Sequence, residues 1–551
     1  MKIIHKLRNN QFTNLLVCIL LILCSPGNIA ADNHILENAN ESQPEQTNFE
    51  DKLFQNLMQF EDKYPDIAEL LLLIAKEEIP EIKIKDYLDC IDWYARLIKT
   101  RISDVNEPGR IVKAINDFLF NELKFIYVQT GNLEDLYLNS VIDKRKGNCV
   151  GMSILYLAIA ERLQLPIFGV NVPEHIFVRF DNGKTNINIE TGHEGMSLPD
   201  SFYITNSIEC FDEDSIENGC FLRNLTIKEV ISNVFLNRSK IRKERGMIKE
   251  ALNDCNKAIL LNPMNPSAYC NRGVIHENMG KFPKAIEDYG KAISLNRKYA
   301  SAYYNRGSVF GVEGKIEQAI NDFNMSISIN PKSTLSYFNR AIALKKTGQV
   351  EKAIQDYDKV IGIDPNFAQA YCNRGVAFAE TGRFENAIND FNRAIELRPD
   401  LNDAYFARGI FFADIKKFKK AIEDFSKSIK LSPSKIFAYY LRGKTYKEIG
   451  EIENAIQDFD KAIMIRPDLA GLYVDRGILL FQIERYDEAI FDFDKSLELL
   501  PGNPVAFRFR GGSFKEKGQF KKAIKDLESF LEIAPNSPVA DIVRNEILEL
   551  K

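Results

Sequence analysis

The sequence predicts an α+β domain that is preceded by helices and followed by an all-α superhelix of repeated helix pairs. One pattern recurs every 34 residues from position 232 to position 537, and a period of this length is typical of helix pairs that stack on one another. Before the repeats, residues 146–190 combine an apolar helical run with three short segments that resemble strands. A chain of 551 residues is also too long for one core. We therefore expect at least two domains.

The composition indicates a folded protein without a strongly charged partner. Hydrophobic residues make up 45% of the chain and charged residues 27%, as in ordinary globular domains. The formal net charge of −5 gives no reason to expect binding to nucleic acid or to an anionic membrane surface. The sequence contains no metal-ligand cluster, no glycine-rich phosphate loop and no nucleotide motif. We therefore expect no metal and no cofactor.

The first 31 residues are typical of a signal peptide. Basic residues open the chain, Leu15–Cys24 forms an apolar run that is short for a membrane span, and Ala30 and Ala31 provide small residues for cleavage. We therefore expect an exported protein, either periplasmic or extracellular. The alternative is a protein anchored in the membrane by an uncleaved or lipidated N-terminal segment. Residues 32–49 are polar without periodicity and predict a flexible tether.

The cysteines do not follow the pattern of a disulfide-rich protein. Seven of the nine lie outside the signal segment, and an odd number leaves at least one cysteine unpaired within the chain. Cys210 and Cys220 are the pair that we consider for a disulfide, and the alternative is that both are small buried residues. The sequence has no Cys-x-x-Cys pair, which argues against a redox function.

Residues 50–231 predict the first domain. Its N-terminal part, residues 50–145, contains amphipathic stretches at helical spacing, which are separated by prolines such as Pro80 and Pro108. Within this part we find only candidate core residues. Residues 146–231 would form the catalytic core, and Thr226 is placed to cap a helix that leads into the repeats.

Cys149 is the candidate nucleophile, because it lies where a basic loop enters a helix. A thiol at a helix N-terminus is close to the positive end of the helix dipole, and the basic residues 144–146 add positive charge. Both effects favour the thiolate. We interpret Gly147 and Gly151 as room for a substrate backbone. The backbone N–H groups at the same helix start could stabilise an oxyanion.

His175 and Glu190 complete a candidate catalytic triad. His175 stands where a turn enters a strand, Asp181–Gly183 indicates a hairpin turn, and Glu190 lies late in the returning strand. Pairing of these strands would bring the carboxylate beside the imidazole, where it would fix the tautomer and support the protonated form. Each residue alone is more often an ordinary structural residue, whereas the three in this order are much more specific. His193, in a predicted loop, is the rival base.

Five segments carry a resemblance to a known family: residues 118–123, 144–149, 153–163, 169–179 and 188–191. They resemble the bacterial transglutaminase-like domain that is often fused to tetratricopeptide repeats. The resemblance implies a papain-like core with Cys149 as nucleophile, His175 as base and Glu190 as acid. It also implies cysteine-dependent acyl chemistry at peptide or amide bonds, by hydrolysis or by transfer. One position departs from the family pattern, because Glu174 replaces the glycine that is usual before the histidine.

The repeats are defined by residues that recur at one spacing. An arginine, an alanine and a proline each recur every 34 residues. The proline is missing once, where Arg297 takes its place. An early aromatic residue, a glycine that usually follows the arginine, a central alanine and a terminal proline resemble the tetratricopeptide repeat. We expect nine repeats over residues 232–537 and a capping helix over residues 538–551. The arginines are Arg238, Arg272, Arg306, Arg340, Arg374, Arg408, Arg442, Arg476 and Arg510.

Two further series follow this period. Each arginine has an aspartate sixteen residues later, for which we expect an ion pair within each repeat rather than a track for an anionic ligand. An asparagine precedes the first five arginines: Asn237, Asn271, Asn305, Asn339 and Asn373. Such amides at a fixed interval can hold the backbone of an extended peptide. The alternative, which we favour, is an ordinary feature of the repeat.

Two function classes follow from these observations. The first is an exported transglutaminase-like cysteine enzyme whose repeats bind a protein partner or the substrate itself. The second is a non-catalytic scaffold for protein–protein interaction, in which the domain around Cys149 is inert. A third class, an assembly factor with a redox-active thiol, is disfavoured because Cys-x-x-Cys is absent.

Overall fold

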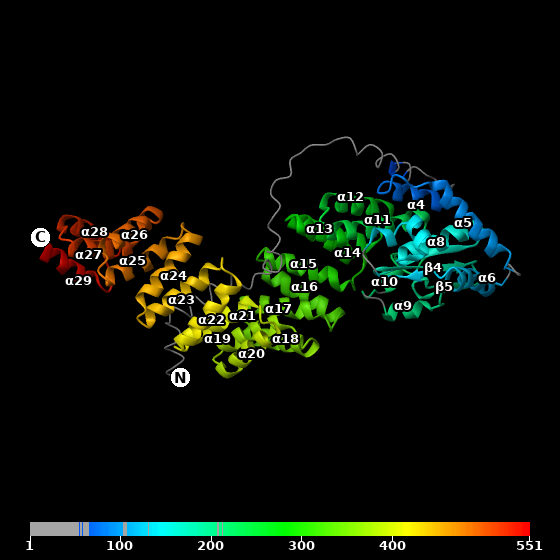
Figure 1. The fold of residues 1–551 in the computed structure, drawn as a ribbon. Helices are drawn as coiled ribbons and strands as arrows, with labels where there is room; N and C mark the ends of the chain where they lie inside the picture. The colour runs from blue at the N-terminus through cyan, green and yellow to red at the C-terminus, as the bar shows by residue number, and fades with distance from the viewer. Residues whose placement is uncertain are drawn as a thin grey trace. The chain divides into compact units, whose positions relative to one another are not determined.

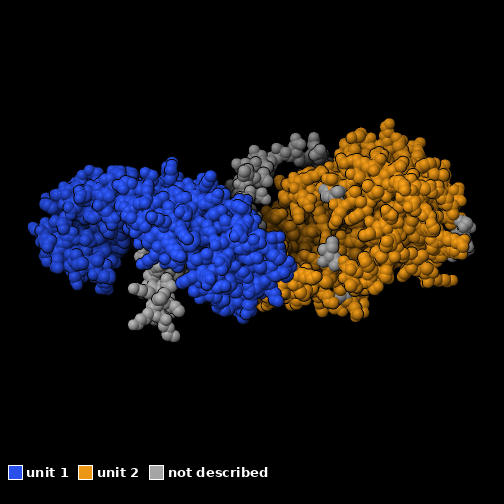
Figure 2. All heavy atoms as spheres, turned by 60° about the horizontal axis from the view of Figure 1, so that its bottom comes forward, with its two compact units in different colours: residues 1–24, 344–551 blue, residues 25–343 orange. Residues whose placement is uncertain are grey.

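The computed structural model describes Phe54, Gln55, Met58 and residues 66–102, 107–129, 132–206, 209–211 and 213–551. The described residues divide into two compact units, one within residues 25–343 and the other within residues 344–551 (Figure 2). Figure 1 shows the helices and strands of both. The signal peptide and the tether expected over residues 1–49 lie outside the described residues. Within the described ranges, no helix has the length and apolar character that crossing a membrane requires.

The unit of residues 25–343 begins with helices that pack around a central helix. Asp66 caps the first of them, because its carboxylate accepts a hydrogen bond of 2.8 Å from the Ala68 N–H. Over the described part of residues 66–148, the elements are α4 (Ile67–Lys76), α5 (Ile84–Lys99), α6 (Pro108–Asn116), η3 (Asp117–Glu122), β1 (Ile126–Tyr127), η4 (Leu133–Asp135), α7 (Leu138–Lys144) and β2 (Lys146–Gly147).

Helix α8 (Cys149–Arg162) and a three-stranded antiparallel sheet form the centre of this domain. Residues 150–160 of α8 are all buried, as expected for a helix that is apolar on every side. The sheet has the order β3 (Ile167–Val172), β4 (His175–Asp181) and β5 (Asn186–Ile189), and α8 packs against β3 and β4. The expected α+β domain is therefore present, and its three strands lie within residues 146–190, where the sequence predicts three short strands.

The end of the domain packs against the second repeat. After η5 (Thr191–His193), α9 (Asp200–Asn206) and α10 (Glu213–Glu217), the buried Cys220 thiol donates to the Leu295 carbonyl oxygen at 3.6 Å, and the Asn296 side chain donates to the Cys210 carbonyl oxygen at 3.0 Å. No disulfide joins Cys210 and Cys220, since Cys210 is exposed and Cys220 faces the repeats.

The remaining chain consists of antiparallel helix pairs. Thr226 caps α11 in a capping box with Glu229, as the sequence predicts. The first and second helices of successive pairs are α11 (Ile227–Glu244) and α12 (Ile248–Leu261), α13 (Pro266–Asn278) and α14 (Phe282–Leu295), α15 (Ala300–Val312) and α16 (Ile316–Ile329), α19 (Ala368–Glu380) and α20 (Phe384–Leu397), α21 (Asn402–Asp414) and α22 (Phe418–Leu431), α23 (Ile436–Glu448) and α24 (Ile452–Ile465), α25 (Ala470–Gln482) and α26 (Tyr486–Leu499), and α27 (Pro504–Glu516) and α28 (Phe520–Ile533), followed by α29 (Ala540–Leu550). Helices α17 (Thr334–Lys346) and α18 (Val350–Ile363) come between α16 and α19 in the sequence.

Small residues allow the two helices of each pair to approach closely. The periodic alanines are fully buried at these contacts. A Cβ atom on Gly409 would lie 2.8 Å from the Phe425 ring, so a larger residue there would push α21 away from α22. In the eight repeats that lie within one unit, the periodic arginine pairs with the aspartate sixteen residues later, as Arg442 does with Asp458. The ion pair expected from the sequence is confirmed in these repeats.

Candidate functional site

Cys149 is the first residue of α8, and the elements around it hold the helix start in place. The Asn148 side chain caps the helix by accepting a hydrogen bond of 2.9 Å from the Gly151 N–H. The Asn148 N–H donates to the Asp135 carbonyl oxygen at 2.8 Å. Strand β2, directly before Asn148, pairs in parallel with β1. The Gly151 N–H is therefore already used, and only the amides nearer to Cys149 remain for an oxyanion.

Two expectations about the surroundings of Cys149 are wrong. The glycines do not make room for a substrate, because a Cβ atom on Gly151 would lie 2.6 Å from the Asp135 carbonyl oxygen and one on Gly147 would lie 3.0 Å from Val141. Both glycines serve internal packing. The basic residues of the loop are also engaged elsewhere, since Lys144 pairs with Glu134 and Lys146 lies 3.7 Å from the Asp135 carboxylate.

His175 and Glu190 meet as the sequence predicts. The His175 Nε2 atom lies 2.7 Å from the Glu190 Oε2 atom. Glu190 is 2% exposed and accepts two further hydrogen bonds, one of 3.2 Å from the Tyr203 hydroxyl and one of 2.9 Å from the Gly192 N–H. Burial alone would raise the pKa of the Glu190 carboxyl, but these donors and His175 lower it below its usual value. Glu190 is therefore held as a carboxylate.

The imidazole of His175 connects this carboxylate with the thiol. Burial alone would lower the pKa of His175, but its side-chain hydrogen bonds with Cys149 and Glu190 raise that pKa to about 10. The ring is consequently protonated at neutral pH and places a positive charge beside the Cys149 sulfur. The positive charge that favours the Cys149 thiolate therefore comes from His175 and not from the basic residues 144–146. His193, the rival base, is exposed after β5, whereas His175 makes the contact with Glu190.

Two tyrosines at the site carry no sequence motif. Tyr203, in α9, stacks on Phe177 with 4.2 Å between ring centroids and donates to Glu190. Tyr127, in β1, is 37% exposed, and negative charge on Cys149 and Glu190 raises the pKa of its hydroxyl in addition to burial. Neither residue belongs to the segments that locate the triad in the sequence, so the folded chain identifies them.

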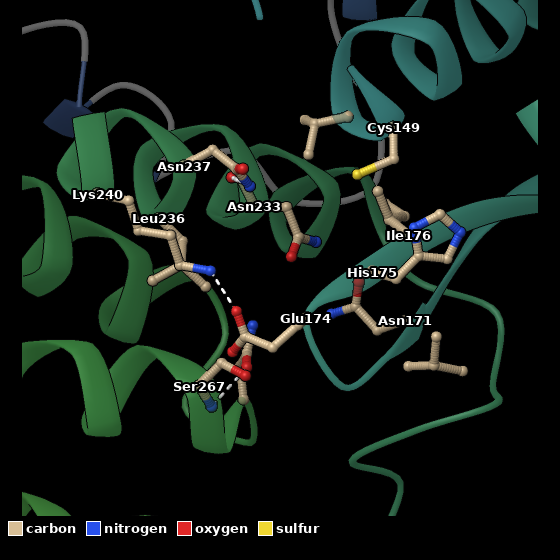
Figure 3. A pocket seen from close by; sticks show the side chains of 13 residues that line it. Cys149, Asn171, Glu174, His175, Ile176, Asn233, Leu236, Asn237, Lys240 and Ser267 are labelled. Atoms are coloured by element: carbon tan, nitrogen blue, oxygen red, sulfur yellow. Dashed lines mark hydrogen bonds and ion pairs between the residues drawn. The ribbon is translucent and has the colours of Figure 1, made fainter. Parts of the chain in front are cut away.

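The pocket beside Cys149 has walls from both the α+β domain and the repeats (Figure 3). The domain contributes Cys149 and the stretch Asn171–Ile176, and helix α11 contributes Asn233, Asn237 and Lys240. Water can reach about 20 Å³ of this space, which is room for roughly one water molecule. Every residue of the pocket belongs to the unit of residues 25–343.

The asparagine series has two kinds of surroundings. Asn237 lines the pocket of Cys149. Asn305 and Asn339 instead donate to the first helix of the preceding repeat, to the Cys270 sulfur at 3.7 Å and to the Tyr304 hydroxyl at 3.2 Å. Asn373 is buried, and the Nδ2 atom of Asn271 is buried without a hydrogen-bond partner in the described structure. These contacts between repeats favour a structural role for Asn305 and Asn339.

Family models cover both parts of the chain. Residues 85–204 match a model of the transglutaminase-like superfamily. Models of the tetratricopeptide repeat match residues 266–299, 300–333, 323–355, 368–401, 403–435, 436–469 and 470–503, and a further repeat model matches residues 240–280 and 343–382.

Individual relatives match only part of the chain. A UPF0162 protein of Xylella fastidiosa (strain Temecula1) is 27% identical over 133 residues, which are 23% of this chain and 46% of that protein. F-box only protein 21 of Mus musculus is 34% identical over 88 residues, which are 15% of this chain and 13% of that protein. The chain thus matches less than half the length of each of these relatives.

Solved structures of repeat proteins also resemble parts of the chain. A tetratricopeptide repeat protein from Parabacteroides merdae is 25% identical, with a TM-score of 0.37, and the match covers 43% of this chain and 93% of that one. YrrB, described as a TPR protein with an unusual peptide-binding site, is 22% identical, with a TM-score of 0.29, and the match covers 32% of this chain and 91% of that one.

Proposed function

The chain carries a transglutaminase-like domain followed by tetratricopeptide repeats, and we propose that it is an exported cysteine enzyme that acts on peptide or amide bonds of a polypeptide held by those repeats. One observation carries the proposal. The pocket of Cys149 and His175 is lined on its other side by α11 of the first repeat and by Ser267 of α13. A polypeptide bound along these helices would therefore end next to the thiol.

The arrangement supports acyl transfer through a thioester. The Cys149 thiolate attacks the carbonyl carbon, a C–S bond forms, and the carbonyl π electrons move to the oxygen beside the amides at the start of α8. When this intermediate collapses, the C–N bond breaks and the His175 imidazolium gives its proton to the leaving nitrogen. Water or an amine then attacks the thioester and gives a proton to His175, and the C–S bond breaks.

The reactivity of Cys149 toward a small alkylating reagent tests this proposal. We expect fast alkylation that persists below about pH 7, because the His175 imidazolium and the helix N-terminus favour the thiolate. His175→Ala should slow the reaction at least about tenfold, and Cys149→Ala should abolish it. The matched control is His193→Ala, which removes the exposed neighbouring histidine and should leave the rate unchanged. Mass spectrometry of tryptic peptides separates Cys149 from the other cysteines.

The size of the pocket favours a second candidate function, a scaffold that binds partners without catalysis. With room for about one water molecule beside the thiol, a substrate can enter only if α11 or the β3–β4 turn moves. Alkylation of Cys149 no faster than that of an unperturbed thiol, and insensitive to His175→Ala, would exclude the enzyme and leave the binding of a protein partner as the function of the repeats.

A further inference from the structure

The turn between β3 and β4 carries a glutamate in a conformation that favours glycine. Val172 pairs with His175 at the end of the two strands, so the turn consists of Pro173 and Glu174. Glu174 has φ = 61°, in the left-handed region, where a side chain costs roughly 1–2 kcal/mol. His175 is the next residue. A glutamate at this position therefore needs a compensating interaction.

That interaction is made with the first two repeats. The Glu174 carboxylate forms an ion pair with Lys240 in α11 and accepts a hydrogen bond of 3.1 Å from the Tyr299 hydroxyl, directly before α15. The hydroxyl oxygen of Ser267, in α13, lies 3.3 Å from the same Tyr299 hydroxyl oxygen, and Ser267 helps to lower the pKa of Glu174. Figure 3 shows Lys240 and Glu174 on one side of the pocket, with Cys149 and His175 on the other.

The ion pair stays charged in this half-buried place. Burial alone would raise the pKa of Glu174, yet Lys240, Ser267 and Tyr299 lower it below its usual value. Burial alone would lower the pKa of Lys240, and the Glu174 carboxylate raises it instead. Tyr299 is 3% exposed and Ser267 is 5% exposed. The partners of Glu174 are thus fixed by their own packing.

Other contacts already attach the repeats to the domain. Arg238 pairs with Glu77 at 2.7 Å, Arg242 pairs with Glu78, and Asn296 donates to Cys210. These contacts are far in sequence from the triad residues. Attachment alone therefore does not require a strained glutamate, whereas Glu174 differs from all of them because it directly precedes His175.

We propose that Glu174 is a positioning residue: its contacts with Lys240 of α11 and with Tyr299, which also contacts Ser267 of α13, hold the turn that aligns His175 with Cys149, so that the first two repeats set the reactivity of the thiol. This inference rests on the proposed function, because it takes Cys149 as a nucleophile. It assigns a regulatory role to the surface where the repeats face the pocket. Any ligand that moves α11 relative to α13 would then alter the reactivity of Cys149.

Three variants of the full-length chain test this role. Glu174→Gly removes the carboxylate and also relieves the turn, Glu174→Gln keeps the backbone and the side-chain length, and Lys240→Met removes the partner without touching the turn. The matched control is Glu484→Gly, a glutamate that also has φ = 61° but lies exposed in the eighth repeat. The rate of Cys149 alkylation is measured against pH, at temperatures where circular dichroism shows each variant folded.

We expect Glu174→Gly, Glu174→Gln and Lys240→Met each to slow alkylation about tenfold and to change its pH profile, because His175 loses its alignment. The Glu174→Gln/Lys240→Met double variant should be no slower than the slower single variant, since both changes break one contact. Glu484→Gly should react like the wild type. Fast alkylation in the wild type that none of the three variants changes would overturn the inference and leave the proposed function standing. Slow alkylation in the wild type would overturn both.

Discussion

Two ion pairs in this chain have nearly the same geometry, but one is structural and the other belongs to the candidate active site. In the seventh repeat, Arg442 donates to Asp458 at 2.7 and 2.8 Å; beside Cys149, His175 lies 2.7 Å from Glu190. The basic side chains are 19% and 26% exposed and the acidic ones 5% and 3% exposed. Distance and burial alone therefore do not separate a structural pair from a reactive one.

The difference lies in what remains free on the basic group. The Arg442 guanidinium also donates to Ser426 of the sixth repeat at 2.8 Å, so each of its three nitrogen atoms has an acceptor. The His175 ring has Glu190 on one side and the Cys149 thiol on the other. An imidazole can also exchange its proton near neutral pH, which a guanidinium cannot. A saturated pair stabilises the fold, whereas a pair with one reactive neighbour can do chemistry.

The largest expected effect concerns Arg238. It occupies a periodic position in the first repeat, but one of its two acidic partners lies outside the repeats. It is completely buried and contacts Asp254 at 2.7 Å and Glu77 of the N-terminal helices at 2.7 Å. Arg238→Met should lower the free energy of unfolding by about 3–5 kcal/mol, because the Glu77 and Asp254 carboxylates each lose a buried cation, even though Arg242 still lies 2.9 Å from Asp254. Arg442→Met, the matched control in a regular repeat, should lower it by about 1–2 kcal/mol. Urea denaturation followed by circular dichroism measures both; equal losses would show that the extra partner of Arg238 contributes nothing.

The pH dependence of stability sharpens the comparison. The pKa of His175 is raised from 6.5 to about 10, so its contribution is complete below about pH 6.5 and is lost as the pH rises through 10. The pKa of Glu190 is lowered from 4.5, so its contribution is complete above about pH 4.5 and is lost as the pH falls through the lower folded value. Both contributions are complete between about pH 4.5 and 6.5.

His175→Gln should therefore destabilise the protein most in this window, by about 2 kcal/mol, and progressively less as the pH approaches 10. Arg442→Gln should show no such decline, because burial alone would lower the pKa of Arg442 but Asp458 raises it above its usual value. Unfolding free energies of both variants and the wild type, measured in urea from about pH 5 to about pH 10, give the two profiles. Parallel profiles would show that His175 does not titrate differently in the folded chain.

The contacts of the periodic residues could be predicted from the sequence, because these residues have the same surroundings in each repeat. The arginine–aspartate pairs, the buried alanines and the helix pairs all follow from one spacing. The triad could be predicted for a different reason. Cys149, His175 and Glu190 lie at the ends of helices and strands whose order the hydrophobic pattern indicates. Their meeting then follows from the hairpin of β4 and β5.

Contacts between segments that are distant in the sequence could not be predicted from the sequence. The sequence suggested that the lysines beside Cys149 favour the thiolate, but Lys146 faces Asp135 instead. The departure at Glu174 was visible, yet its reason lies in Lys240 and Tyr299, which are 66 and 125 residues away. Nothing in a single sequence says which helix will cover a pocket, because that depends on how two folded parts pack.

The smallest expected effect comes from turns that join the two helices of a repeat. Gly382 and Gly450 have positive φ there, whereas Lys416 takes the same place with φ = 61°. Lys416→Gly relieves the left-handed side chain but increases the freedom of the unfolded chain, so the two terms nearly cancel. We expect a change in unfolding free energy of at most about 0.5 kcal/mol, and a loss of about 1 kcal/mol for the reverse change Gly450→Lys. Thermal unfolding of the two variants measures this difference.

The same measurement separates the turn of Glu174 from the turns within the repeats. If Glu174→Gly changes only the free energy of unfolding, and by as little as Lys416→Gly does, then the turn between β3 and β4 only connects two strands. If Glu174→Gly also changes the rate of Cys149 alkylation, the turn is part of the candidate active site.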